Sequence, residues 1–331
     1  MRFRFKLSYL SIGLLVLIIS MSFFTPRTNA YSQGDISINV NPQNPSPNKN
    51  TTITLSSYAY DLNSILITWS VGGKRASSGI GQKFFSVTAP TLGKQTTVTA
   101  TIALPDGDVN QTVTIRPSIM TLLWQANDSY VPAFYKGKAL PSPNSEVKIV
   151  AVPEIKNSSG FIDPKNMLYA WKLNSTNDQD SSGYGKNSFV YTSDYLDSSN
   201  LVSVTASTID QSYSADGNIN VQTTDPKIEF YKNDLNIGTI WEQTLGDGHK
   251  ITGNEIIQAI PYFISPKDIR IPFLTFTWSI NGQQVTVPSY SKNLLPLTLQ
   301  AGTSGTAKIG LQVDNVNNLV ETANKEINVQ F

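Results

Sequence analysis

The stretch Ile67-Thr68-Trp69-Ser70-Val71-Gly72-Gly73 places a tryptophan among alternating residues just before a polar turn. The same arrangement returns in Tyr169-Ala170-Trp171-Lys172-Leu173-Asn174-Ser175 and in Phe276-Thr277-Trp278-Ser279-Ile280-Asn281-Gly282. Alternation followed by Gly or Asn is typical of a β-strand that enters a tight turn. Because the unit recurs about every hundred residues, we predict three domains of one kind.

Two further strands are predicted after each tryptophan. The alternating stretches are residues 98–102 and 113–115, residues 204–207 and 219–221, and residues 309–313 and 327–329. The polar turns between them are predicted at Asp106-Gly107-Asp108, at Asp216-Gly217-Asn218 and within residues 314–318. Short strands at regular spacing without helical periodicity indicate an all-β chain of antiparallel sandwiches.

The length of 331 residues suits three such domains. Proline-containing junctions at Arg116-Pro117 and Thr224-Asp225-Pro226 predict boundaries that give domains 31–116, 117–224 and 225–331. Because both junctions are short and contain proline, we expect semi-rigid joints.

Residues 1–30 have the pattern of an export signal. Arg2, Arg4 and Lys6 precede an apolar stretch from residue 7 to residue 24, and small residues end the segment at Ala30. This pattern predicts either a cleaved signal peptide or a retained N-terminal membrane anchor. In both cases we expect an exported protein whose membrane contact is confined to this segment.

Composition excludes several kinds of function. Of 25 basic residues four lie in residues 1–30, which leaves 21 against 24 acidic residues, a net charge of −3. Such a surface offers no basic field for nucleic acid. The chain has no cysteine, so disulfides, thiol nucleophiles and cysteine-ligated metals are excluded.

The tryptophan strand, the Val98-Thr99-Ala100-Thr101 strand and the Asp-Gly hairpin together resemble bacterial immunoglobulin-like or PKD-like modules. The stretch from Arg116-Pro117 through Leu122-Leu123-Trp124 to Phe134-Tyr135-Lys136-Gly137-Lys138-Ala139-Leu140-Pro141 is similar to exported tandem proteins of candidate-phyla bacteria. The resemblance implies three tandem immunoglobulin-like (Ig-like) β-sandwiches at the cell exterior, and it implies no activity.

Aromatic residues are the first candidates for a binding site. Trp69, Trp171 and Trp278 are predicted to fill sandwich cores, although ligand-stacking platforms are the alternative. A second set occupies the opening segments of the second and third domains. Its members are Trp124, Tyr130, Phe134, Tyr135 and Trp241. We expect either packing between domains or an exposed patch for a partner.

Oxygen-bearing side chains recur at alternate positions in two places, and they are weak candidates for Ca²⁺ ligands. They are Asp106, Asp108 and Asn110, and then Asp216, Asn218 and Asn220. Several oxygens in a row can begin a Ca²⁺ loop. The same residue types are favoured in hairpin turns, and we predict turns here.

Catalytic and cofactor sites are not predicted. His249, the single histidine, is expected on a surface loop, where it cannot form a triad or a multi-histidine metal site by itself. Ser289-Tyr290-Ser291-Lys292 matches a Ser-x-x-Lys dyad, but that dyad requires the start of a helix, and we expect strand and turn here.

We therefore predict a non-enzymatic, structural or adhesive cell-envelope protein without cofactors. Its expected partners are other envelope or cell-surface proteins, with glycans as an alternative. The alternative functions are an accessory subunit of a secretion or pilus machine and a carbohydrate-binding module. A hydrolase is a more distant alternative, because no carboxylate pair can be identified in the sequence.

Overall fold

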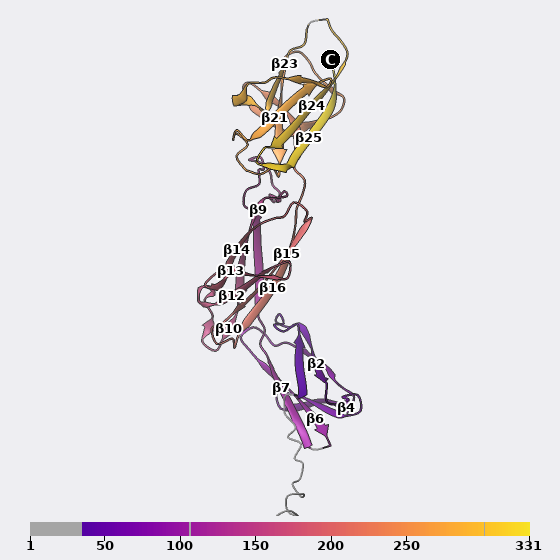
Figure 1. Cartoon of the computed structure of the whole chain (residues 1–331), viewed down its shortest axis with the longest axis vertical. Coiled ribbons are helices and arrows are strands. Elements are labelled where there is room, and N and C mark those ends of the chain that lie inside the picture. The colour runs from indigo at the N-terminus through magenta and orange to yellow at the C-terminus, as the bar shows by residue number, and fades with distance from the viewer. Residues whose placement is uncertain (1–34, 106, 301) are drawn as a thin grey trace, which may run out of the picture. The chain divides into compact units, whose positions relative to one another are not determined.

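The computed structural model describes residues 35–105, 107–300 and 302–331. Strands dominate this part of the chain, and its helical elements are short 3₁₀ turns such as η2 (Pro164–Asn166) and η3 (Ser289–Ser291) (Figure 1). No helix within the described ranges is long and apolar enough to cross a membrane. The all-β prediction is confirmed, whereas the predicted export segment lies outside the described residues.

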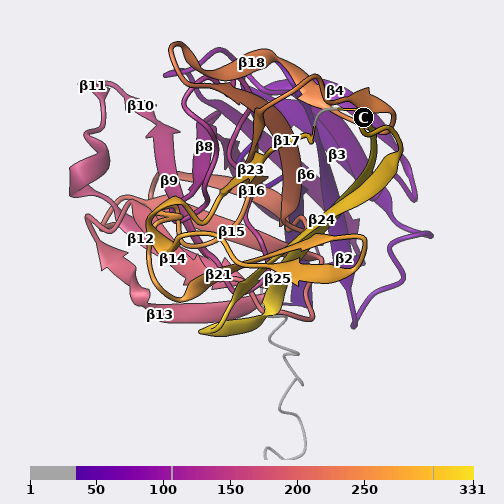
Figure 2. The same ribbon diagram turned by 90° about the horizontal axis from the view of Figure 1, so that it is seen from above.

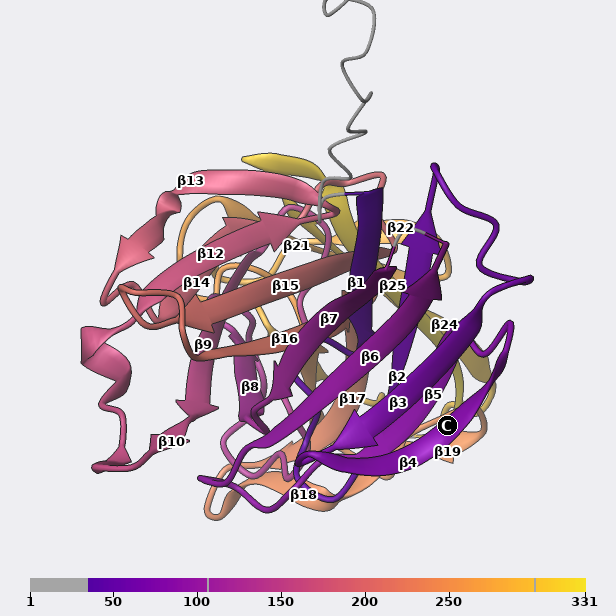
Figure 3. The same ribbon diagram turned by 90° about the horizontal axis from the view of Figure 1, so that it is seen from below.

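The described residues form two compact units. The first contains residues 35–41, 52–87 and 97–114, and the second contains residues 42–51, 88–96 and 115–331. The first unit contains two sheets. One has the strand order β1 (Ile36–Asn41), β2 (Asn50–Ser57), β5 (Phe84–Thr88), and the other has the order β4 (Lys74–Ile80), β3 (Leu66–Val71), β6 (Thr96–Leu104), β7 (Gly107–Ile115). Figure 3 shows the last four strands side by side. Trp69 of β3 stacks on Phe85 of β5 and so joins the two sheets.

The second unit holds two further pairs of sheets. In the first pair, one sheet has the strand order β14 (Ser188–Thr192), β9 (Glu146–Glu154), β8 (Ile119–Ala126). The other has the order β13 (Thr176–Tyr184), β12 (Leu168–Leu173), β15 (Ser199–Ser207), β16 (Ser214–Gln222). Strands β10 (Lys156–Asn157) and β11 (Gly160–Phe161) add a small hairpin. Buried side chains from both sheets form one core around Trp171. This pair of sheets is the second sandwich.

The other pair is the third sandwich. One of its sheets has the strand order β18 (Gly238–Leu245), β17 (Lys227–Asp234), β20 (Glu255–Tyr262), β23 (Leu294–Leu297). The other has the order β19 (His249–Lys250), β25 (Asn318–Gln330), β24 (Thr306–Asn315), β21 (Leu274–Ile280), β22 (Gln283–Val285). Figure 2 shows β24 and β25 side by side. All of these pairings are antiparallel except that of β19 with β25, which is parallel.

One structural device recurs in all three sandwiches. The indole nitrogens of Trp69, Trp171 and Trp278 donate to the backbone oxygens of Gln82, Lys186 and Lys292 at 2.7, 2.9 and 2.9 Å. In each sandwich, the backbone oxygen of the residue that follows this acceptor receives a hydrogen bond from an amide of the opposite sheet. The three amides are those of Leu55, Ala151 and Ala259. The three chain segments therefore build Ig-like antiparallel β-sandwiches of one design. The boundaries near residues 116 and 224 stay a prediction.

The predicted turn at Asp216-Gly217-Asn218 is wrong. These residues lie within β16, where Asp216 pairs with Thr205 and Asn218 pairs with Ser203. The connection from β15 instead spans residues 208–213, where Thr208 and Asp210 close the turn through their side chains. Gly217 serves packing rather than a turn, because a Cβ there would collide with the side chain of Met120 on β8.

Candidate functional site

Six aromatic rings gather in the second unit. They are Phe134, Tyr135, Tyr231, Trp241, Tyr262 and Phe263, and we call them the aromatic cluster. Phe134 meets Trp241 edge-on at 5.9 Å, and Trp241 lies 5.3 Å from Tyr231. Tyr135 makes edge contacts with Tyr262 at 5.7 Å and with Phe263 at 5.8 Å. Edge-to-face contacts at such distances are favourable for aromatic rings.

The cluster is assembled from two distant stretches of sequence. Strands β17, β18 and β20 carry Tyr231, Trp241 and Tyr262, whereas Phe134 and Tyr135 lie on the connection between β8 and β9, residues 127–145. This β8–β9 connection is tied to the third sandwich by two backbone bonds at Tyr130. Its amide donates to the Ile264 oxygen at 2.8 Å, and its oxygen accepts from the Phe263 amide at 2.7 Å.

Side chains strengthen this attachment. One carboxylate oxygen of Asp128 accepts from the Lys267 amide at 2.9 Å, and the other accepts from the Ser265 hydroxyl at 3.2 Å. Glu321 is buried, with 1% of its surface exposed. Its carboxylate accepts from Ser142 Oγ and the Ser265 amide at 2.5 Å each, and from Asn315 Nδ2 at 2.9 Å. Burial raises the pKa of Glu321, and these hydrogen bonds oppose the rise.

Two tyrosines of the aromatic cluster form a hydrogen bond through their hydroxyl groups. The hydroxyls of Tyr231 and Tyr262 lie 2.7 Å apart, and burial is the main cause that raises the pKa of Tyr262. Burial also raises the pKa of Tyr130, which packs against the core of the third sandwich. Both phenols therefore stay protonated over the physiological pH range, and the neutral hydroxyl of Tyr262 bonds that of Tyr231 within the cluster.

Exposure is concentrated at one ring of the cluster. Phe134 is 70% exposed, whereas Trp241 is half-buried and Tyr231 is buried. The hairpin between β17 and β18 adds Leu235, 87% exposed, and Ile237, 77% exposed. These residues present apolar surface to solvent on the same hairpin that carries Trp241.

Trp124 and Tyr130 do not join this exposed surface. Trp124 lies on β8 and packs against the core of the second sandwich. The ammonium of Lys138 covers its ring at 3.3 Å from the centroid, and burial lowers the pKa of that lysine. Trp124 makes no ring contact with the cluster within the described part of the chain. Of the five aromatic candidates, the structure brings together Phe134, Tyr135 and Trp241.

The three repeat tryptophans are fully enclosed. Trp69, Trp171 and Trp278 each have 0% of their surface exposed. Each stacks on a phenylalanine, with centroids 5.2 Å apart at Phe85, 5.5 Å at Phe189 and 5.5 Å at Phe230. Rings in this position fill cores and have no face for a ligand.

The candidate Ca²⁺ ligands lie mainly on strands. Asp108 and Asn110 are in β7, the second triplet is in β16, and Asp106 lies outside the described residues. The hydroxyls of Thr101 and Thr205 donate to Asn110 and Asp216 at 2.6 Å each. Alternate positions on a strand are about 6.6 Å apart, so such side chains form a row rather than a closed loop.

The prediction that His249 lies on a surface loop is wrong. His249 forms β19, and its Nε2 lies 2.7 Å from the carboxylate of Glu255, a side chain that is 1% exposed. Lys232 lies 3.8 Å from the other carboxylate oxygen. A buried carboxylate requires such partners, and sequence spacing alone does not show which residues supply them.

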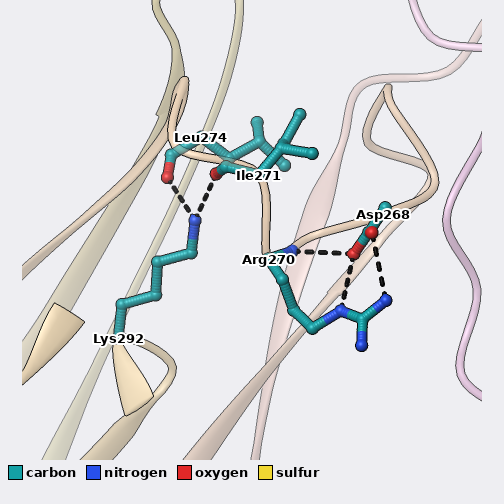
Figure 4. Close-up of polar contacts among 5 residues, drawn as sticks. All are labelled: Asp268, Arg270, Ile271, Leu274 and Lys292. Carbon is teal, nitrogen blue, oxygen red and sulfur yellow. Dashed lines mark hydrogen bonds and ion pairs between the residues drawn. The ribbon is translucent and has the colours of Figure 1, made fainter. Parts of the chain in front are cut away.

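Lys292 has a structural role rather than that of a catalytic base. Its ammonium donates to the backbone oxygens of Ile271 and Leu274 at 2.6 and 2.7 Å (Figure 4). Burial lowers the pKa of Lys292, and nearby Asp268, which itself binds Arg270, opposes this shift. The expected strand and turn is wrong here, because Ser289–Ser291 form the short 3₁₀ helix η3, but no Ser289–Lys292 hydrogen bond is present among the described residues. The lysine holds the loop before β21.

Tyr262, Phe263 and Glu321 were not identified as site residues from the sequence. Tyr262 and Phe263 follow Pro261 directly, so an aromatic pair at the end of a strand was visible. Glu321 carries no local signal, because its partners Ser142 and Ser265 lie far away in the sequence.

No family model and no curated protein sequence matches this chain. Similar solved structures include fibronectin(III)-like modules of Clostridium thermocellum CbhA, at 15% identity over 57% of this chain and 94% of that chain, with a TM-score of 0.27. Another is the central fibronectin-III array of RIM-binding protein, at 11% identity over 89% and 95%, with a TM-score of 0.30. A third is the three N-terminal domains of the bacteriophage RB49 outer capsid protein Hoc, at 11% identity over 89% and 98%, with a TM-score of 0.24.

Proposed function

We propose that this chain is a non-enzymatic, exported cell-envelope protein whose tandem Ig-like sandwiches present the aromatic cluster to another protein. The observation that carries the proposal is the position of Phe134, which is 70% exposed and yet in contact with Trp241. Large aromatic side chains that rest on a packed support dominate binding energy at protein interfaces.

Pre-organisation supports this role. The backbone bonds at Tyr130 and the two acceptor bonds at Asp128 hold the β8–β9 connection in place before any partner arrives. A partner therefore spends less free energy on ordering the loop that carries Phe134. Tyr231 supports Trp241 from within the sheet.

A protein partner fits this cluster better than a glycan. Stacking on a sugar requires a free ring face, and Trp241 is already contacted by both Phe134 and Tyr231. Lys138 covers a face of Trp124. The exposed Leu235 and Ile237 on the neighbouring hairpin add aliphatic surface, which is suited to a protein contact.

A photo-crosslinking amino acid at position 134 tests the proposal in the native envelope. We expect it to join the chain to a defined envelope or surface protein, and the same substitution at Tyr290, which is 91% exposed and outside the cluster, should not. The crosslink made with the same amino acid at Leu235 should weaken when Trp241 is changed to alanine. Equal crosslinking from positions 134 and 290 would contradict the proposal.

A further inference from the structure

A second surface in the third sandwich differs from its counterparts in the other two. The outer face of the sheet that carries Trp278 contains a hollow of about 680 Å³. Its lining includes the polar side chains of Thr277 and Ser279 on β21, Gln284 on β22, Gln312 on β24, and Asn324 and Glu326 on β25. Figure 1 shows β21, β24 and β25 in this sandwich. We call this surface the polar hollow.

The hollow exists because Gly310 has no side chain. Gly310 pairs with Ser279 on the neighbouring strand. In the first and second sandwiches the equivalent pairs are Ser70 with Thr99 and Lys172 with Ser203. A Cβ on Gly310 would lie 2.7 Å from Ser279 Oγ, so a side chain at this position would fill the floor. Gly310 thus stands where the other two sandwiches have a threonine and a serine.

Hydrogen-bonding groups are also left unused in the hollow. On the equivalent faces, Thr99 bonds Thr112 at 3.0 Å, Thr101 bonds Asn110 at 2.6 Å, and Thr205 bonds Asp216 at 2.6 Å. Within the described ranges, the side chains of Ser279, Gln284 and Asn324 make no hydrogen bond of this kind. Donors and acceptors on β21, β22 and β25 of one sheet therefore line the hollow without protein partners.

The one charged side chain in the lining of the hollow is paired, which suits an uncharged ligand. Its acidic group, Glu326, is neutralised by Lys308 at 2.6 Å. The amide of Gln312 is held by Asp314 at 3.0 Å. Hydroxyls and amides both donate and accept, as sugar hydroxyls do, and the lining is more polar than apolar. We propose that the polar hollow binds a neutral glycan, separately from the protein contact at the aromatic cluster.

Calorimetric titration of the full chain with cellohexaose, chitohexaose and mannohexaose tests this site. We expect at least one hexasaccharide to bind weakly, with a Kd on the order of 1 mM or below. Gly310→Thr, which introduces the residue of the first repeat, should reduce affinity at least tenfold. Asn324→Ala, which leaves the floor open, should reduce it severalfold. Ser203→Thr on the second sandwich is the matched control and should leave binding unchanged.

Two outcomes would overturn the assignment. One is that none of the three hexasaccharides binds the unaltered chain, or that binding is equal in Gly310→Thr. The other is that a protein ligand, rather than a hexasaccharide, is lost in Gly310→Thr, which would assign the hollow to a protein partner. Crosslinking from position 134 should be unaffected by Gly310→Thr, so this proposal and that for the aromatic cluster fail independently.

Discussion

The indole of each core tryptophan combines two interactions, a stack on a phenylalanine ring and an N–H hydrogen bond to the backbone. At Trp171 the ring stacks on Phe189 at 5.5 Å while Nε1 donates to the Lys186 oxygen at 2.9 Å. The stack fills the space between the sheets, and the hydrogen bond satisfies a carbonyl in the strand connection. The recurrence of both features at Trp69 and Trp278 explains why the tryptophan is the clearest mark of the repeat.

Replacing Trp171 with phenylalanine separates these two contributions. The variant keeps an aromatic ring but leaves the Lys186 oxygen without its donor and creates a small cavity. We expect the free energy of unfolding to fall by about 2–4 kcal/mol, measured by chemical denaturation. Trp241→Phe is the control. That side chain is half-buried and lacks a hydrogen bond among the described residues, so the loss should stay below about 1 kcal/mol. Equal losses would show that the indole bond contributes nothing.

Two elements far apart in sequence are joined through one carboxylate. Glu321, on β25, binds Ser142 of the β8–β9 connection and the Ser265 amide at the same time. Asn315, on β24, fixes its second oxygen. Because the group is buried, its charge is costly even with these partners. The protonation state of this side chain therefore contributes to the attachment of the β8–β9 connection, beside the bonds made by Tyr130 and Asp128.

The raised pKa of Glu321 predicts a specific pH dependence. The folded chain holds this proton more tightly than the unfolded chain, so the resulting stability is fully present below the ordinary value of 4.5 and is lost as the pH rises through the folded pKa. The slope is at most about 1.4 kcal/mol per pH unit. In denaturation series across pH, Glu321→Gln should flatten this slope, and Glu154→Gln on an exposed strand position should leave it intact. Unchanged slopes in Glu321→Gln would refute this assignment.

Within the second unit, the third sandwich is completed by residues that precede its predicted first residue. Tyr130 packs against its core, Asp128 binds the loop after β20, and Ser142 binds Glu321 on β25. A boundary at residue 225 would therefore cut the sequence at a sensible junction and still remove stabilising contacts. Domain boundaries predicted from the sequence therefore need not coincide with boundaries defined by side-chain contacts.

Calorimetry on two fragments measures this coupling. A fragment of residues 225–331 lacks the β8–β9 connection, whereas residues 117–331 retain it. We expect the third sandwich to melt several degrees lower in the shorter fragment, since about 1 kcal/mol shifts the Tm of a domain of this size by about 4–8 °C. Ser142→Ala in the longer fragment should give a smaller shift in the same direction. Identical Tm values would mean that the connection does not support the sandwich.

Sequence reasoning succeeded where the chemistry is local. Alternation around Trp69, Trp171 and Trp278 predicted strands with short turns after them, and the structure has β3, β12 and β21 at these positions. It failed at Asp216-Gly217-Asn218, because residues that favour turns also fit a strand whose neighbour approaches closely. It also missed the partners of His249, since Glu255 becomes buried only when the sheets pack.

The all-β class and the repeated tryptophan strand could be predicted from the sequence alone, because each depends on periodicity or composition within a short window. The export segment is predicted in the same way and stays a prediction, since it lies outside the described residues. The structure was needed to show which aromatic residues meet, that Trp124 makes no ring contact with Trp241, and that Gly310 lines a hollow. Those facts depend on register between strands and on contacts between residues more than a hundred positions apart. No local pattern specifies such contacts, because they arise from burying the sheets against each other.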